Sequence, residues 1–376
     1  MANKKIIKTF KIKSVEELFD FIQGKNNFED LREKFIFRGI ENEKYQLIPS
    51  ALREKNDGHV IDDYIVDSEF RLCWCLSPKQ SFEEGFISRE YYKLIGDKGK
   101  MFFYTNKSSK SITENENCIN INNKSDFYLR KEIYVLMKFL NFADKSGLKV
   151  PVTQRIRNSI HSIFDNGAKK TFHSWPNFEY FELISLAQHY GIPTRALDWS
   201  YDYKVALYFA VKDILKDENN SKNNCVLWAL NYKKFEFSNN ELTNSFNEFH
   251  FHYYRPEYVN NPNLNAQKGL FTFWINNLNE DVNLKPLDEI IFNELENAKK
   301  EYDGDEVKYK LGRNINLSLK NDEKIFYKII IPGKLKAEIL NELYLEGYSE
   351  EFLFPGYFGV TDSIKNKTKI DYLLNK

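Results

Sequence analysis

The sequence predicts an α+β fold, with a mixed or antiparallel central sheet and flanking helices. Helical periodicity dominates residues 125–214, whereas short apolar runs typical of buried strands dominate from Cys225 onward. Helices and strands do not alternate along the chain as they would in a parallel α/β fold. Hydrophobic residues make up 42% of the 376-residue chain, which is enough to build a large core.

The first predicted elements are a helix and a strand. Ser14 and Glu17 form a capping box, in which the serine caps the helix and the glutamate reaches back to the same turn. The apolar run 35–37 predicts a buried strand, which ends on Arg38 followed by Gly39. A fixed positive charge at the end of a buried strand indicates either a polar pocket or a buried ion pair. We expect a pocket, with residues 189–200 as its opposite wall.

A polar stretch separates these elements from the next helices. Residues 57–124 are largely Asn/Ser/Lys-rich and unperiodic, which favours a surface insertion. Helical periodicity resumes over 125–147 and again over 151–164. A third helix is predicted to begin near Pro176 and to end at Gly191.

The remaining elements are mostly predicted strands. The run TRALDWS is predicted to be a short strand or a loop, and Asp202 then opens a helix whose apolar stripe reaches Ile214. Length and composition predict strands over residues 225–230, 270–275 and 325–331. A last helix follows 332–333 and closes at Gly347.

Composition and charge exclude several function classes. Lys+Arg 54 and Asp+Glu 54 balance to a formal net charge of +0, which argues against electrostatic attachment to DNA or an anionic membrane. No apolar run approaches the ~20 residues of a membrane span, and no signal peptide is recognisable. The four cysteines show no zinc-ligand spacing. We therefore expect a soluble, cytoplasmic protein with no membrane partner and no bound metal.

Candidate site residues concentrate in the stretch 185–211, around a helix end, a tight turn and the start of the next helix. They are Gln188, His189, Tyr190, Thr194, Arg195, Asp198, Trp199 and Ser200. His189 lies at a helix C-terminus, where the backbone dipole favours the protonated imidazole. Each residue also has a structural alternative: Asp198 and Ser200 could cap the next helix, and Arg195 could pair with Asp198.

Several motifs resemble the FRG domain family, which is named for its Phe-Arg-Gly motif. The matching segments are residues 37–39, 47–53, 188–195, 197–200, 206–210, 265–271, 331–333 and 353–356. The most specific is the His-Tyr-Gly-x-Pro-Thr-Arg block. The resemblance implies a single FRG-like domain over 31–364 with a variable insertion at about 57–124. A helical lead-in over 1–30 precedes the domain, and a tail over 365–376 follows it.

The family occurs in bacteria and phages and is often suspected of a part in defence. Its layout is similar to the ADP-ribosyltransferase fold, with its split sheet. Carried over by position, Arg38 is the residue that ends the first core strand, and Ser200 precedes the helix with the Ala-x-x-Phe-Ala-like pattern. Gln267 lies nearest the position that the catalytic glutamate occupies in the ADP-ribosyltransferase fold. The resemblance thus implies an NAD-using enzyme, either an ADP-ribosyltransferase or an NAD glycohydrolase, in bacterial or phage conflict.

The chemistry of NAD cleavage assigns roles to these residues. Arginine offers a planar, permanently charged fork for a pyrophosphate, an aromatic side chain can stack on nicotinamide, and a serine can bind the ribose. A carboxylate must stabilise the oxocarbenium character of the transition state, and Asp198 or Glu257 could supply it where Gln267 cannot. The predicted catalytic residues are Arg38, His189, Asp198 and Gln267. The predicted NAD-binding residues are Arg38, Tyr190, Thr194, Arg195 and Ser200.

Two other function classes remain open. A binding or sensor module would recognise a nucleotide or a phage component without chemistry, and the glutamine at the expected glutamate position favours it. A nuclease would use His189, His173 or the pair His250 and His252, which share a face if their segment is a strand. The expected partners are a nucleotide and a macromolecular acceptor, either protein or nucleic acid. The oligomeric state stays open.

Overall fold

The computed structural model describes residues 6–55, 58–65, 124–158, 174–236, 250–259, 261–277, 283–311 and 316–376. Most of the predicted insertion over 57–124 lies outside these residues, as do His173 and residues 159–164 of the second predicted helix. The chain forms two compact units. Unit 1 comprises residues 1–48, 196–274 and 285–376, and unit 2 comprises residues 49–195 and 275–284.

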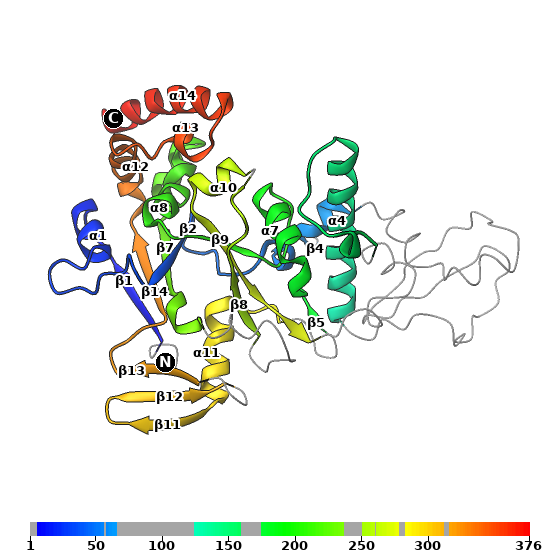
Figure 1. The fold of residues 1–376 in the computed structure, drawn as a ribbon. Helices are drawn as coiled ribbons and strands as arrows, with labels where there is room; N and C mark the ends of the chain where they lie inside the picture. The colour runs from blue at the N-terminus through cyan, green and yellow to red at the C-terminus, as the bar shows by residue number, and fades with distance from the viewer. Residues whose placement is uncertain are drawn as a thin grey trace, which may run out of the picture. The chain divides into compact units, whose positions relative to one another are not determined.

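Unit 1 is built on a seven-stranded sheet of order β1-β14-β7-β2-β6-β9-β8 (Figure 1). Its strands are β1 Ile7–Lys11, β2 Phe35–Ile40, β6 Leu197–Ser200, β7 Cys225–Asn231, β8 Phe251–Tyr254, β9 Gly269–Trp274 and β14 Phe326–Ile331. β1 and β14 run parallel, and every other neighbouring pair is antiparallel. The mixed sheet with its helices confirms the predicted α+β class.

Helices pack on one face of this sheet. They include α1 Val15–Ile22, α8 Tyr203–Val211, α12 Lys336–Leu345, α13 Glu350–Leu353 and α14 Tyr357–Leu374. Their apolar side chains share one buried cluster with the alternate residues of β2 and β7, for example Phe37 and Leu227. The predicted cap of α1 is present, since Ser14 Oγ accepts from the Glu17 N–H at 3.2 Å. Glu17 itself reaches back to the N–H of Lys13 at 2.6 Å.

The opposite face of the sheet is covered by elements that the sequence analysis did not predict. They are α11 Leu287–Asn297 and a meander of β11 Lys299–Asp303, β12 Glu306–Lys310 and β13 Asn316–Lys320. Ile36, Val226 and Phe326 of the sheet bury against Ile291 of α11 and Leu317 of the meander. Because both faces are covered, the central strands are apolar almost throughout, and β7 is buried at every position.

The chain termini of unit 1 both contribute regular structure. Residues 7–11, within the predicted helical lead-in, form β1, and the last helix α14 extends to Leu374.

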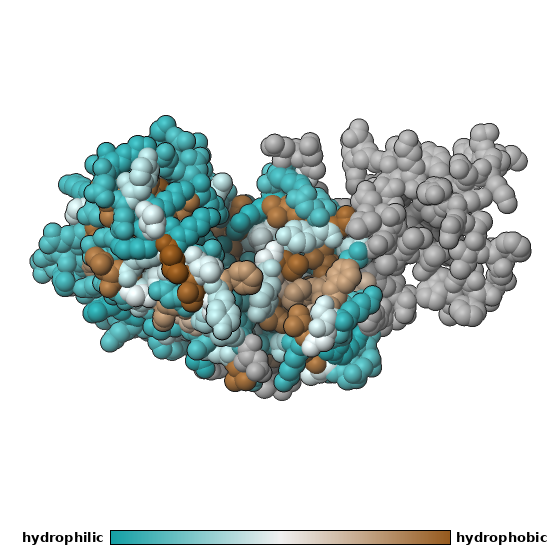
Figure 2. All heavy atoms as spheres, turned by 90° about the horizontal axis from the view of Figure 1, so that it is seen from above, coloured by the Kyte–Doolittle hydropathy of each residue, from teal (hydrophilic) through white to brown (hydrophobic). Residues whose placement is uncertain are grey.

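Large side chains on α14 are exposed, with Tyr357 92% and Phe358 89% accessible. Figure 2 views the molecule from this side and shows apolar residues set among hydrophilic ones. None of the described helices is both long and apolar enough to cross a membrane.

Unit 2 is mainly helical in its described residues. It contains α4 Lys124–Lys145 and α7 Phe181–His189, which correspond to two of the predicted helices. The short strands β5 Ser174–Trp175 and β10 Asn276–Asn277 pair with each other, as do β3 Glu54–Lys55 and β4 Gly58–His59. A small apolar cluster joins Ala51, Ile61, Tyr134 and Val135.

Candidate functional site

The Phe-Arg-Gly motif lies on β2, where its three residues have three structural tasks. Phe37 is fully buried on the helix-covered face. Arg38 points to the other face, where its Nη1 donates to the Asp198 carbonyl oxygen at 2.6 Å and to Asp198 Oδ2 at 2.8 Å. The guanidinium therefore ties β2 to β6. Its side chain is 13% exposed, whereas that of Asp198 is 47% exposed.

Gly39 lets the backbone of α8 approach β2. A Cβ at this position would lie 1.9 Å from the Ala206 carbonyl oxygen and 2.6 Å from the Ala210 nitrogen. Both atoms belong to the helix backbone, so no side-chain rotation can relieve the clash. The glycine is therefore required by packing rather than by backbone conformation.

Gly39→Ala is expected to destabilise unit 1 by about 3 kcal/mol or more, because the helix must move off the sheet. Urea unfolding of the full chain measures this. Gly347→Ala is the control: its φ is +86°, but a Cβ there would meet nothing within 4 Å. The control should lose only about 1–2 kcal/mol of left-handed strain. Equal losses in the two variants would show that the close approach of α8 is unimportant.

Ser200 and Gln267 both form hydrogen bonds within unit 1. Ser200 Oγ donates to the Gln267 carbonyl oxygen at 2.7 Å and accepts from the Asp202 N–H at 2.9 Å. The Gln267 amide Nε2 donates to the Leu353 carbonyl oxygen at 3.1 Å. Asp202 caps α8, as predicted, by accepting from the Lys204 N–H at 3.0 Å. These groups fasten the end of β6 to the helices that follow it.

In unit 2, two of the family motifs are joined by a small hydrogen-bond network. Ser50 Oγ and Thr194 Oγ1 both donate to Gln188 Oε1, at 3.0 and 2.8 Å. The Thr194 N–H donates to Ser50 Oγ at 3.1 Å. Beside this network, the Tyr190 ring is 57% exposed and stands edge-on to His189, with ring centroids 5.2 Å apart.

Arg195 is the centre of a buried network in unit 2. Its Nε donates to Glu132 Oε1 at 2.6 Å, and its Nη1 donates to Asn276 Oδ1 at 3.0 Å. Trp175 Nε1 donates to the second carboxylate oxygen of Glu132 at 2.8 Å. Burial raises the pKa of Glu132, whereas Arg195 and Trp175 act in the opposite direction. The partner of Arg195 is thus Glu132, not Asp198.

The predicted site residues divide between the two units. Unit 1 holds Arg38, Asp198, Ser200 and Gln267, and unit 2 holds His189, Tyr190, Thr194 and Arg195. Within unit 1 the structure brings Arg38 to Asp198 and Ser200 to the Gln267 backbone. Glu257, the other carboxylate considered, is exposed.

The histidines that the structure describes do not gather into a metal-binding cluster. His250 stacks on Trp274 with ring centroids 5.7 Å apart, and His252 lies in β8. Across the described part of the chain, no three His, Cys, Asp or Glu side chains gather so that they could hold a metal ion. His173 lies outside the described residues.

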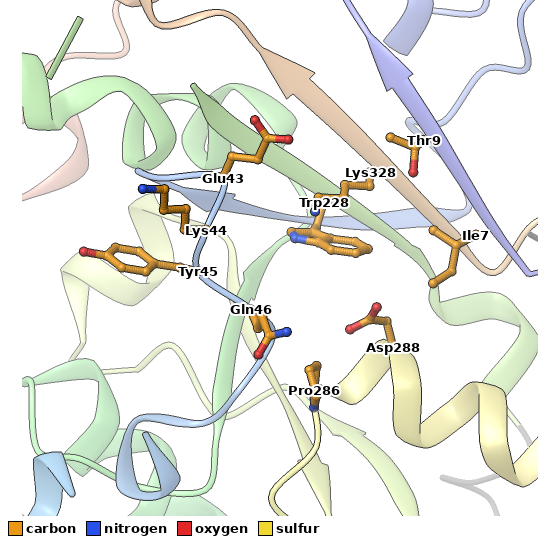
Figure 3. A pocket seen from close by; sticks show the side chains of 10 residues that line it. All are labelled: Ile7, Thr9, Glu43, Lys44, Tyr45, Gln46, Trp228, Pro286, Asp288 and Lys328. Carbon is orange, nitrogen blue, oxygen red and sulfur yellow. The ribbon is translucent and has the colours of Figure 1, made fainter. Parts of the chain in front are cut away.

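The sheet face that carries Arg38 also bears a pocket of about 360 Å³ (Figure 3). We call it the Trp228 pocket. Its lining residues are Ile7, Thr9, Glu43, Lys44, Tyr45, Gln46, Trp228, Pro286, Asp288 and Lys328. Trp228 is 3% exposed, and its buried Nε1–H has no hydrogen-bond partner. A buried donor of this kind is rare, and it requires an acceptor that either water or a ligand supplies.

Two opposite charges line the same pocket. The Lys328 ammonium lies 5.5 Å from the centroid of the Trp228 ring, and no ion pair holds it within the described structure. Asp288, in the first turn of α11, likewise has no side-chain partner among the described residues. Burial raises the pKa of the Asp288 carboxyl, while its own backbone N–H and Lys328 lower it.

Sheet register places these groups in one row. Thr9 pairs with Lys328, Lys328 with Trp228, and Trp228 with Arg38, across four neighbouring strands. Residues directly opposite one another in a sheet share a face. The pocket could not be predicted from the sequence, because the run CVLWAL predicts only a buried strand. The available signal was Lys328, a charge inside the apolar run IFYKIII, just as Arg38 interrupts its own strand.

The fold and this pocket define an α+β protein with a ligand-sized hollow on one face of a mixed sheet. Residues 123–219 match the family model of the FRG domain. This match confirms the resemblance to the FRG domain for these residues, which include the His-Tyr-Gly-x-Pro-Thr-Arg block. A search of curated proteins and a search of solved structures found no match. The matched region includes α4, α7, β6 and α8.

Proposed function

We propose that this FRG-domain protein is a nucleotide-binding module whose ligand enters the Trp228 pocket and is not cleaved there. The observation that carries the proposal is the buried Trp228 Nε1–H without an acceptor, at the wall of a pocket of about 360 Å³. Pockets of this size, with an aromatic wall and a few convergent polar groups, are typical of small-molecule sites.

The groups of the pocket match the parts of a nucleotide. The indole of Trp228 lines the pocket, and its Nε1–H lacks an acceptor that a nucleotide oxygen could supply. Gln46 and Asp288 can hydrogen-bond to the edge of a base, and the ammonium groups of Lys44 and Lys328 can attract a phosphate. NAD is the first nucleotide to test, because the family resemblance implies it. A sensor of this kind fits a part in bacterial or phage defence.

Binding without cleavage is favoured because the predicted catalytic side chains of unit 1 are held in structural hydrogen bonds. An NAD-cleaving site needs a carboxylate beside the breaking glycosidic bond. Gln267 carries no charge, and its amide is held by the Leu353 carbonyl oxygen. Arg38 is held by Asp198, and the Ser200 hydroxyl is held by the Gln267 backbone. A nucleotide in the Trp228 pocket would therefore meet none of these three predicted groups, since Arg38, Ser200 and Gln267 do not line it.

The test is a thermal-unfolding and calorimetric titration of the full chain with NAD and with nucleoside monophosphates, with nicotinamide release followed in parallel. A ligand that binds only the folded state at 100 times its Kd stabilises it by about 2.7 kcal/mol. Trp228→Phe, which keeps the apolar ring but removes the N–H, should weaken binding about 5- to 20-fold. Trp274→Phe, outside the pocket, is the control and should bind normally.

Each other result points to a different function. Nicotinamide release that is lost in Arg38→Ala would instead support an ADP-ribosyltransferase or NAD glycohydrolase. Cleavage of RNA or DNA that a chelator suppresses would support a nuclease. Failure of every nucleotide to bind would refute the proposed module.

A further inference from the structure

We infer that the outer face of α14 is a self-association surface, on which a second copy of this chain packs with its own α14 running antiparallel. The inference goes beyond the proposed function and does not depend on the Trp228 pocket. The observations that carry it are an exposed, uncharged stripe along α14 and the symmetric order of the side chains in that stripe. Figure 1 shows α14 along an edge of unit 1, next to α12 and α13.

The two faces of α14 differ. The buried residues that hold the helix against unit 1 are Gly359, Ser363 and Ile370. The outward stripe is uncharged and consists of Tyr357, Thr361, Ile364, Thr368 and Tyr372. Spacings of four, three, four and four residues keep these side chains on one side of the helix. Because a surface helix normally turns charged and polar side chains outward, an outward stripe of this composition indicates a contact surface.

The large side chains of this face are well exposed. Within the stripe, Tyr357 is 92% accessible, Ile364 68% and Tyr372 58%. Phe358, at the edge of the stripe, is 89% accessible. An aromatic side chain buries about 150–250 Å² when it is covered, so the three rings of one copy expose about 350–600 Å². Two such faces together offer about 700–1,200 Å², which reaches the ~1,000 Å² of a small specific interface.

The two threonines of the stripe add to its apolar character. Thr361 Oγ1 donates to the Phe358 carbonyl oxygen at 2.9 Å. Thr368 Oγ1 donates to the Ile364 carbonyl oxygen at 3.3 Å. Both hydroxyls are therefore engaged within the helix, and the methyl groups are left for a partner.

The stripe reads nearly the same in both directions, as Tyr-Thr-Ile-Thr-Tyr with Ile364 at its centre. A two-fold symmetric contact joins the same patch on both copies, so each residue i that meets j is matched by a j that meets i. An antiparallel pair of α14 helices centred on Ile364 meets this requirement. Tyr357 of each copy then lies beside Tyr372 of the other. Thr361 likewise lies beside Thr368, and the two Ile364 side chains meet at the axis.

Most charges of α14 are already engaged within unit 1. Lys367 forms an ion pair with Asp371 at 3.2 Å, one turn along the helix. Lys369 Nζ donates to the Leu215 carbonyl oxygen at 2.6 Å. These contacts hold the helix in place and leave its outward stripe free of charge.

The remaining two charges of α14 complement each other across the antiparallel pair. Asp362 and Lys365 are exposed, and neither has a side-chain partner in the described part of the chain. They flank Ile364 on either side in the sequence, so the pair of helices brings Asp362 of each copy toward Lys365 of the other. Two reciprocal ion pairs follow, and they favour the antiparallel order.

A lipid surface fits this face less well than a second copy. A helix that lies on an anionic membrane carries Lys and Arg on its polar face, where they meet the lipid headgroups. The unengaged charges of α14 are instead one acid and one base, Asp362 and Lys365. Equal and opposite charges suit a second copy of the same helix.

The first test is analytical ultracentrifugation of the full chain over a concentration series. The parent should pass from monomer to dimer with a Kd of about 1–100 µM, as expected for a small interface. Ile364→Lys places two ammonium groups at the axis and should weaken the dimer at least about tenfold. Leu345→Lys is the matched control: Leu345 lies on α12, outside the stripe, and is 69% accessible. This control should dimerise as the parent does.

The second test addresses the antiparallel order. Asp362→Lys and Lys365→Asp each bring like charges together across the pair, so each variant alone should dimerise at least about fivefold more weakly. In an equal mixture of the two variants, one chain is positive at both positions and the other is negative at both. The mixture should therefore form a heterodimer about as tight as the parent dimer.

Urea unfolding of every variant should match the parent, because each changed side chain is exposed. A parent that stays monomeric throughout the series, a dimer that Ile364→Lys leaves intact, or a mixture without recovery would overturn the inference. Binding of a monomeric parent to anionic phospholipid vesicles, lost in Ile364→Lys, would overturn it too and assign the stripe to a lipid surface. Nucleotide binding is measured separately, so none of these outcomes decides the proposed function.

Discussion

Arg195→Met is expected to lower the free energy of unfolding of unit 2 by about 3–5 kcal/mol, because it leaves a buried carboxylate without its charged partner. Arg195 and Glu132 are 2% and 4% exposed, and their atoms approach to 2.6 Å. Trp175 and Asn276 complete the network, but both side chains are neutral and cannot replace the charge of the guanidinium. Urea unfolding of the full chain measures the loss.

The same variant should show a characteristic pH dependence. Burial already raises the pKa of Glu132, and Arg195 opposes that rise. Without the guanidinium the pKa rises further, so the folded unit holds the carboxyl proton more tightly than the unfolded chain does. Protonation then favours the fold, and the deficit of the variant should shrink as the pH falls from about 8 to about 5.

Two comparisons decide whether charge is the cause. Arg195→Met combined with Glu132→Leu should recover part of the loss, since neither charge is then buried. Arg155→Met removes a cation that is 80% exposed in its ion pair with Glu179, so it should change stability by less than about 1 kcal/mol. A double variant no more stable than Arg195→Met would show that packing, not the orphaned charge, dominates.

Lys336→Met is expected to cost unit 1 a similar amount, about 3–5 kcal/mol. The Lys336 ammonium is fully buried and donates to both oxygens of Asp213, each at 2.9 Å. It also donates to the carbonyl oxygens of Glu41 at 3.0 Å and Asn220 at 3.3 Å. No apolar side chain can satisfy these four acceptors.

The matched control is Lys334→Met, two residues earlier and exposed, which should change stability by about 0.5 kcal/mol or less. Both variants are followed by urea unfolding under the same conditions. A Lys336→Met protein as stable as this control would mean that water replaces the ammonium at Asp213. That outcome would remove the basis for treating this pair as a buried anchor of α12.

Much of the sheet could be predicted from the sequence, because its central strands are short apolar runs. The runs that became β2, β7, β9 and β14 each lie between breaks in the apolar pattern. β1 could not be found in this way, because IKTFK has only two apolar residues among polar ones. Among the described strands, its one neighbour in the sheet is β14. The meander β11–β13 is similarly polar and half-exposed.

The candidate site was less predictable than the fold. The sequence indicated that Arg38 meets either a pocket or an ion pair, and Asp198, its partner, lies 160 residues away. Nothing local distinguishes the two cases, because the choice depends on which strands become neighbours. Glu132 was not considered for Arg195 because it sits in an ordinary helical pattern. The Trp228 pocket draws residues from five separate segments, whose meeting depends on sheet order.

The place of β14 in the sheet has a consequence for how the protein forms during synthesis. β14 lies between β1 and β7, and Ile7 is in register with Phe326. The ribosome has therefore made almost the whole chain before β1 gains its neighbour, whereas the sequence of unit 2 is complete at residue 284. A nascent or truncated chain that stops before β14 leaves two strand edges open. Such edges pair readily with other chains, so premature termination favours aggregation over a partly folded intermediate.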